Sequence, residues 1–175
     1  MRSIFVFTAS NPQAQINIGR SIARPVDPSI VLGQTPHSHL TEINRIFLQS
    51  VGFYLWGAVP GPRNIPNWES MRAGDWVLAV WEGHYHYAAK VVAKFHWRDL
   101  AVALWGREDG TGLTWEYLYF LTRPESTTAV SCERLGLYLN RSYRGFARIG
   151  DQKMALIQRT FGSVDKFIES VLLVR

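Results

Sequence analysis

The sequence predicts an α+β domain built around a curved, mixed β-sheet. Short segments rich in β-branched and aromatic residues alternate along the chain with segments of helical periodicity. Two of the strand-like segments flank the pair Glu82–Gly83, which is typical of a β-hairpin turn. Apolar residues make up 47% of the chain, an ordinary share for a protein that buries a core.

The N-terminal elements are predicted from propensity and from helix-start signals. Ser3–Thr8 is short, β-branched and aromatic, so we expect a strand there. Asn11 is a good helix cap and Pro12 suits the first helical position, which predicts a helix over Gln13–Ala23. Arg24–Ser38 contains three prolines and a glycine, and is expected to form a loop or a short insertion.

The middle of the chain begins with a second predicted helix, from Ser38 or Thr41, because the apolar residues that follow recur at helical spacing. Phe53–Trp56 is predicted to be a strand. The segment Gly57–Asn67 contains three prolines and is predicted to be a loop.

A hairpin and a short helix follow. Trp76–Trp81 and His84–Phe95 are the two predicted hairpin strands, and the alanine-rich Arg98–Trp105 is predicted to be helical. Thr114–Leu121 alternates like a half-buried strand. Thr127–Ser131 is considered as one more strand.

The C-terminal third is basic and is expected to be partly helical. Helices are predicted over Asp151–Phe161 and Ser163–Val174, separated by Gly162. The formal net charge is +5, and 15 of the 19 basic residues are arginine, which pairs with phosphate and stacks on rings. We expect one domain over residues 1–175, with a core over about 3–131 and a basic helical segment over about 132–175. Alone this charge fits a solvated basic face equally well, but together with the tryptophans described below it favours a polyanionic partner.

The composition excludes several classes of protein and of site. Cys132 is the single cysteine, which excludes an intrachain disulfide and a zinc site built on several cysteines, and favours a reducing cytoplasm. No apolar run approaches the roughly 20 residues that a membrane-spanning helix needs. We therefore expect a cytoplasmic protein with no membrane partner.

The seven tryptophans are the main functional signal. Trp56 and Trp105 each end a short apolar segment and are followed directly by glycine, in a region rich in turns and arginines. Flat rings in this setting suit the binding of another flat ring, such as a nucleobase. Trp76 and Trp115 lie in apolar or alternating segments, and are predicted to be core residues.

Three pieces of the chain, in this order, resemble the YTH and EVE families of the PUA-like superfamily. Ile4–Asn11 is a strand that runs into a polar turn and a helix, as YTH domains begin. Leu55–Asn64, followed by Met71–Leu78, looks like the EVE pattern of a loop, a short helix and a Met-x-x-Gly-Asp turn. Leu104–Gly106 with Thr114–Leu121 is similar to segments in the DNA-reading domains of McrBC-type modification-dependent restriction proteins.

The resemblance implies a curved mixed β-sheet or barrel flanked by helices, and a module that flips a modified base into an aromatic cage. In YTH proteins the base is N6-methyladenine in RNA, and some prokaryotic relatives read methylated bases in DNA. On this pattern Trp56 is one wall, and Trp105, or alternatively Trp97, is another. The third wall is expected from Trp81, Tyr85 or Trp68.

The same resemblance gives roles to polar residues. Ser10 and Asn11 correspond to groups that bond the base edge, and Gln13 is expected to add to them. Ser10 and Asn11 have an alternative role, because both residues also fit a simple helix cap and turn. Phosphate contacts are expected from four arginines: Arg63, Arg141, Arg144 and Arg148.

Catalytic patterns in the sequence are weak, so we expect a non-catalytic domain with no metal and no cofactor. His84 and His86 share a strand face but have no third ligand at a suitable spacing. Glu108–Gly110 reads as a turn rather than a pair of catalytic carboxylates, and Cys132 has no evident base beside it.

The function predicted from the sequence is recognition of a modified base, with N6-methyladenine in DNA favoured. The domain would be the specificity module of a modification-dependent restriction system, with nuclease or AAA+ activity on a fused or partner chain. The alternative is a reader of N6-methyladenine in RNA or an RNA-modification accessory domain. A third interpretation is an ordinary small-molecule or protein-interaction pocket, which predicts background affinity for nucleic acid.

Overall fold

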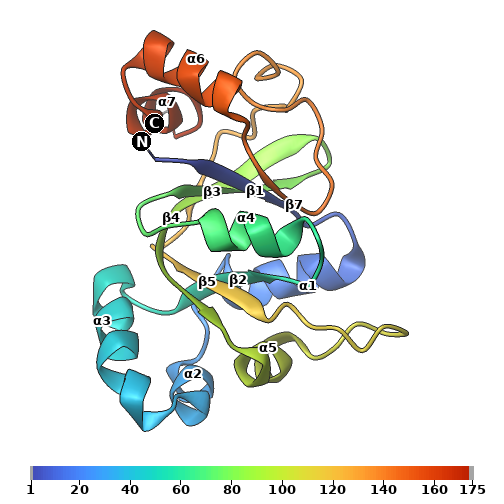
Figure 1. The fold of residues 1–175 in the computed structure, drawn as a ribbon, viewed down its shortest axis with the longest axis vertical. Helices are drawn as coiled ribbons and strands as arrows, with labels where there is room; N and C mark the ends of the chain where they lie inside the picture. Colours follow the sequence, from blue (N-terminus) through green and yellow to red (C-terminus); the bar gives the residue numbers. More distant parts are fainter. Residues whose placement is uncertain (1, 174–175) are drawn as a thin grey trace.

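The computed structural model describes residues 2–173 and has a mixed α+β architecture (Figure 1). Within these residues seven strands form one mixed sheet of order β2-β5-β4-β3-β1-β7, with β6 paired to β4. β1 and β3 are parallel, and the other pairs are antiparallel. The strands are β1 (Ile4–Thr8), β2 (Tyr54–Ala58), β3 (Trp76–Trp81), β4 (His84–His96), β5 (Tyr117–Leu121), β6 (Glu125–Ser126) and β7 (Phe146–Arg148).

The long strand β4 joins two halves of the sheet. Its first half, from His84 to Lys90, pairs with β3, and its second half, from Val91 to His96, pairs with β5. The register shifts between Val91 and Ala93, and a shift of this kind bends a strand. The predicted curved mixed sheet is therefore confirmed, but it does not close into a barrel, because β2 and β7 remain its two edges.

A short helix, α4 (Asn64–Ser70), lies between the two open edges (Figure 1). The Trp68 indole N–H donates to the Leu118 carbonyl of β5 at 2.9 Å. The Asn67 amide donates to the Phe146 carbonyl of β7 at 3.3 Å. α4 thus bonds both halves of the sheet.

The remaining helices lie around this sheet. Helix α1 starts as predicted, since the Asn11 side chain accepts from the Ala14 N–H at 2.8 Å. The Ser163 hydroxyl likewise caps α7 by accepting from the Lys166 N–H at 3.1 Å. The helices are α1 (Pro12–Ser21), α2 (Pro28–Gln34), α3 (Leu40–Ser50), α5 (Arg98–Trp105), α6 (Asp151–Phe161) and α7 (Val164–Val171), with a 3₁₀ turn at His37–His39.

Two loops predicted from their prolines prove to contain helices. Residues 24–38 were predicted to be a loop or a short insertion, and the first alternative is wrong over α2, where Asp27 caps the helix and Pro28 occupies its first turn. The loop prediction for 57–67 is wrong at both ends, because β2 continues to Ala58 and α4 begins at Asn64. Proline is tolerated in the first turn of a helix, where its missing N–H has no partner to lose.

The strand predictions near the C-terminal part need three corrections. β5 begins at Tyr117, so residues 114–116 precede it. The strand considered at Thr127–Ser131 is wrong, since the short strand there is β6 and the 127–131 segment makes only an isolated bridge. Strand β7 was not predicted, because three residues are too few for a pattern.

Two hydrophobic cores lie on opposite faces of β1. Phe5 and Phe7 point into an inner core enclosed by the bent sheet, α1 and α5, and this core is rich in aromatic rings. Ile4 and Val6 point into an outer core, which α6, α7 and the 132–149 segment cover. The alternation along β1 follows from the period of two in a strand.

Candidate nucleic-acid interface

A pocket of about 280 Å³ lies where β1, β2 and β7 meet the first turns of α1 and α4. Its volume lies just below the range of roughly 300–1,000 Å³ that small-molecule pockets occupy. Its walls combine aromatic and polar side chains. Those used below are Phe7, Thr8, Asn11, Trp56, Asn64, Glu108 and Trp115.

Trp56 forms the floor of this pocket. It is 4% exposed, and one neighbour, Phe7, stacks on it with ring centroids 4.6 Å apart and an interplanar angle of 19°. Trp105 packs beside it at 5.7 Å, tilted by 54°. Trp56 is therefore at once a core residue and a surface of the pocket.

Trp115 forms a more accessible wall and is held in place by its neighbours in the chain. Its carbonyl oxygen would lie 2.1 Å from a Cβ atom at position 57, so only glycine allows this approach. Before it, the Thr114 hydroxyl donates to the Gly106 carbonyl at 2.8 Å. After it, Glu116 is hydrogen-bonded to His96 Nε2 at 2.9 Å and forms an ion pair with Arg98 at 3.1 Å. These contacts fix the backbone that carries the Trp115 ring.

Four polar side chains line the pocket. Three of them also stabilise the backbone around it: the Thr8 hydroxyl accepts from the Gly145 N–H at 3.0 Å, Asn11 caps α1, and the Asn64 amide donates to the Val59 carbonyl at 3.0 Å. Glu108 is the fourth, and one of its carboxylate oxygens accepts from the Thr111 hydroxyl at 3.1 Å.

The pocket continues into a second hollow of about 360 Å³ at its mouth. The two share Asn11, Glu108 and Trp115, and the outer one adds Gln13 and Arg107. Two of the predicted phosphate-binding arginines adjoin residues of the inner pocket in sequence, since Arg63 precedes Asn64 and Arg144 precedes Gly145. Both are exposed. Basic residues thus adjoin the lining of an aromatic pocket in the chain, and one of them, Arg107, lines the neighbouring hollow.

The other tryptophans that were predicted to form the cage do not line this pocket. Trp105 does not line the pocket: it is 4% exposed, contacts Trp56 directly, and leaves no room for a base between the two rings. Its indole N–H has no hydrogen-bond partner within residues 2–173. Trp97 packs edge-on against Phe95, and Trp68 is engaged by its bond to β5 and by Lys94, whose ammonium lies 4.6 Å from its ring.

Trp81 and Tyr85 lie at the β3–β4 hairpin, away from the pocket. The His86 ring stacks on Trp81 with centroids 3.6 Å apart, and burial lowers the pKa of His86. Tyr85 is fully buried under the C-terminal segment, and its hydroxyl lies 2.8 Å from that of Tyr143. Burial raises the pKa of Tyr85 well above its ordinary value and that of Tyr143 to about 12, so both phenols stay neutral.

Of the remaining polar residues that were predicted to bind nucleic acid, only Gln13 lines a hollow at the site. Ser10 is exposed and does not line the pocket, whereas Gln13 does so at the mouth and donates to the Asn17 side chain at 3.1 Å. Arg148 pairs with Asp151 at 2.9 Å, which occupies part of its guanidinium. Arg141 is exposed and packs near Gly136.

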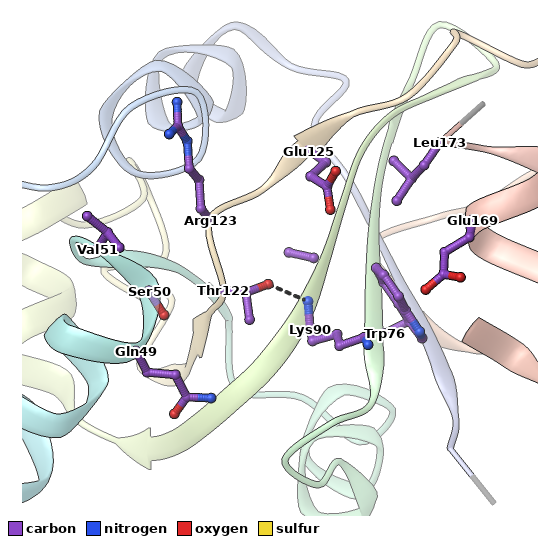
Figure 2. Close-up of a pocket in the computed structure, with 11 residues that line it drawn as sticks. Gln49, Ser50, Val51, Trp76, Lys90, Thr122, Arg123, Glu125, Glu169 and Leu173 are labelled. Atoms are coloured by element: carbon purple, nitrogen blue, oxygen red, sulfur yellow. Dashed lines mark hydrogen bonds between the residues drawn. The ribbon is translucent and has the colours of Figure 1, made fainter. Parts of the chain in front are cut away.

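A separate pocket, of about 430 Å³, opens at the other end of β1, between α3 and α7 (Figure 2). Trp76 lies in it, but the Lys90 ammonium lies 4.8 Å from the Trp76 ring and 2.9 Å from Asp165. The Trp76 indole N–H also donates to Asp165, at 3.0 Å. The prediction that Trp76 is a core residue is confirmed, since it is 4% exposed.

Of the seven lining residues named above, sequence reasoning missed five as site residues: Phe7, Thr8, Asn64, Glu108 and Trp115. Trp115 was predicted to be a core residue because of the alternating segment that contains it. The signal that distinguishes it is its position two places before β5 and three places after Gly112, the last glycine of the preceding turn.

Two other classes of site are not seen in the part of the chain described. Among residues 2–173 no group of three His, Cys, Asp or Glu side chains is placed to hold a metal ion. No helix in the same range has the length and apolarity to cross a membrane.

Comparison with known proteins rests on structure. No protein-family model matches the sequence, and no curated protein matches it. The N-terminal domain of Thermococcus gammatolerans McrB, solved bound to m5C DNA, aligns with a TM-score of 0.64 and 14% identity, over 97% of this chain and 99% of that one.

Two YTH domains also align. That of Zygosaccharomyces rouxii MRB1, solved with N6-methyladenosine RNA, covers 90% of this chain and 85% of its own, at 13% identity and a TM-score of 0.44. The Pho92 YTH domain, solved with m6A, covers 94% and 88%, at 13% identity and the same TM-score. The resemblance to the DNA-reading domains of McrBC-type proteins is confirmed at the level of the fold: this chain has the fold of the McrB N-terminal domain over nearly its whole length.

Proposed function

We propose that this domain recognises a methylated base in DNA, and that it takes the base out of the helical stack into the pocket between Trp56 and Trp115. The observation that supports this most strongly is the pocket itself, with an indole floor, an indole wall and polar groups at its edge. The McrB domain that shares the fold was solved with methylated DNA, which favours DNA as the ligand.

The energies are of the right size for a base-flipping reader. Stacking of a base on an aromatic side chain contributes about 1–3 kcal/mol, and unstacking a base from a duplex costs a few kcal/mol. One buried methyl group adds only about 0.8 kcal/mol, or roughly fourfold in affinity. A stronger preference for a methylated base therefore requires hydrogen bonds to its edge, and we propose Asn11 and Asn64, which line the pocket, for this role.

Two methylated bases are candidates. N6-methyladenine is favoured by the sequence resemblance, and 5-methylcytosine is the mark named for the McrB neighbour. Arg63, Arg107 and Arg144 are the basic residues closest in the chain to the pocket lining, and would hold the phosphates on either side of the flipped base. Nuclease or nucleotide-hydrolysing activity would come from a fused or partner chain.

The test is a binding panel with one DNA sequence in four forms: unmodified, and carrying N6-methyladenine, 5-methylcytosine or N4-methylcytosine. A matched single-stranded RNA with N6-methyladenine is the fifth ligand. We expect one methylated DNA to bind at least tenfold more tightly than unmodified DNA, with affinity that falls steeply with salt. Equal affinity for all the DNA forms, or a clear preference for the methylated RNA, would overturn the proposal.

A further inference from the structure

The candidate pocket contains a carboxylate, which is unusual for a site that receives a polyanion. Among residues 2–173, Glu108 is the only charged side chain that lines the inner pocket, in a chain whose formal net charge is +5. A carboxylate here repels phosphate groups, so it gives no help to backbone binding. Its place among the ring-binding residues therefore points to a role with the base.

Glu108 is held in position by its own loop. Its N–H donates to the Leu113 carbonyl at 2.7 Å, and its carbonyl accepts from the Gly112 N–H at 3.0 Å. One carboxylate oxygen, Oε2, accepts from the Thr111 hydroxyl. The other oxygen, Oε1, has no hydrogen-bond or ion-pair partner within residues 2–173. A positioned acceptor is thus left available in the pocket.

The other polar groups of the pocket do not supply Glu108 with a donor. Thr8 and Asn11 each use a side-chain oxygen to accept a backbone N–H, and the Asn64 amide donates to Val59. An ionised carboxylate can only accept hydrogen bonds, so any ligand in the pocket must bring an N–H or O–H group to it. Adenine and cytosine present an exocyclic amino group, whereas thymine presents a carbonyl oxygen at the same edge.

We propose that Glu108 determines which bases the pocket accepts, by requiring an amino N–H on the base edge. The inference rests on the proposed function, and it adds the class of base. Both 5-methylcytosine and N6-methyladenine keep an amino hydrogen and satisfy this rule. Thymine places its O4 oxygen, and N6,N6-dimethyladenine a second methyl group, where the amino hydrogen would otherwise meet the carboxylate.

The experiment uses two matched pairs of bases in one DNA duplex. 5-Methylcytosine is compared with thymine, which carries the same methyl group, and N6-methyladenine with N6,N6-dimethyladenine. Each base is placed opposite an abasic site, so that differences in pairing energy do not contribute. For the wild-type protein we expect the amino-bearing member to bind at least tenfold more tightly, in whichever pair is the better ligand.

Two variants test whether the carboxylate causes this ratio of affinities between the amino-bearing base and its matched partner. Glu108→Gln keeps the size of the side chain, adds a donor and should reduce the ratio to within about threefold. Asp109→Asn is the control: it removes the same charge from the neighbouring residue, which lies only at the mouth, and should raise affinity for both members without changing their ratio. A full wild-type ratio in Glu108→Gln would overturn the inference.

The outcomes separate this inference from the proposed function. A clear preference for methylated over unmodified DNA, with no discrimination within either pair, would contradict the role of Glu108 but still support the recognition of a methylated base. No preference for any methylated DNA would overturn both. The wild-type measurements need no variant, so the first of these outcomes is decisive even if Glu108→Gln folds poorly.

Discussion

Two pockets lie at opposite ends of β1, and each contains a tryptophan, but the surroundings of the two rings differ. Beside Trp76 the polar groups are paired with one another: Lys90 covers the ring and bonds Asp165, and the indole N–H bonds the same carboxylate. Beside Trp115 the ring borders a hollow, and a carboxylate oxygen of Glu108 has no partner in the described chain.

The difference shows how to tell a binding surface from a structural contact. A tryptophan whose face and N–H are both engaged has nothing to offer a ligand, however close it lies to a cavity. A ring that is held by its backbone, as Trp115 is by Gly57 and Thr114, keeps a face for stacking. The five predictions below test this contrast, beginning with the largest expected effect.

Trp105 supports the pocket from behind, so its loss should affect stability first. Trp105→Ala removes a buried ring in contact with Trp56 and is expected to lower the free energy of unfolding by about 3–5 kcal/mol. Denaturant titration measures this. Trp81→Ala, at the partly exposed hairpin end, is the control and should cost clearly less. A Trp105→Ala protein of wild-type stability would place Trp105 outside the core.

Trp115 is expected to contribute directly to binding. Trp115→Ala should reduce affinity for the preferred methylated DNA by about 1–3 kcal/mol, or roughly 5- to 150-fold, because one stacking surface is lost. Fluorescence anisotropy measures the affinities. Trp81→Ala again serves as the control and should bind like the wild type. If the two variants lose affinity equally, the pocket at Trp115 is not where the base binds.

Gly57 lets the Trp115 backbone approach β2. Gly57→Ala places a Cβ atom 2.1 Å from the Trp115 carbonyl oxygen, so the loop must move. We expect a loss of stability of about 1–3 kcal/mol and weaker binding of methylated DNA. Gly61→Ala is a matched control, because its Cβ would meet nothing closer than 3.8 Å. Unchanged binding in Gly57→Ala would mean that the position of Trp115 does not matter.

The Trp76 pocket should respond to pH and not to DNA. Burial raises the pKa of Asp165, but hydrogen bonds from Lys90, Trp76 and Arg2 outweigh this and hold it below its ordinary value. A lowered pKa in the folded state stabilises the protein at neutral pH, and this contribution disappears as the pH falls through that pKa.

Asp165→Asn should therefore lower the free energy of unfolding at pH 7 and make less difference at pH 3. Its preference for methylated DNA should remain that of the wild type. Thermal unfolding at the two pH values measures the first effect, and anisotropy the second. A loss of preference in Asp165→Asn would mean that the two ends of β1 are not independent.

Arg144 is expected to have the smallest effect. Arg144→Ala should weaken methylated and unmodified DNA equally and lower the slope of log affinity against log salt by about 1, as expected for one phosphate contact. Arg159→Ala removes the same charge from the exposed face of α6, which covers the outer core, and should leave the slope unchanged. A change in the methylated-to-unmodified ratio in Arg144→Ala would contradict a pure phosphate role.

Local signals in the sequence predicted much of the fold. The Glu82–Gly83 turn has two residues with positive φ, as a two-residue hairpin requires, and the helix Arg98–Trp105 has the predicted bounds. Asn11 and Ser163 cap the helices that follow them. These features depend on neighbouring residues, which is why the sequence is enough to predict them.

The site was harder to predict because it depends on contacts between distant segments. Trp115 meets Gly57 only because β2 and β5 pair in antiparallel register, with Gly57 opposite Leu118. Periodicity reports that a residue is covered on one side, but not by which element. For the same reason the sequence could not distinguish Trp56, which faces both core and pocket, from Trp105, which faces only the core.

Base extrusion is tested most directly with 2-aminopurine placed next to the methylated base, since its emission rises when its stacked neighbour leaves. With the preferred methylated DNA we expect emission to rise on saturation with wild-type protein, and to stay low at saturation with Trp115→Ala. Tight binding by the wild-type protein with unchanged emission would contradict a flipped base held against Trp115.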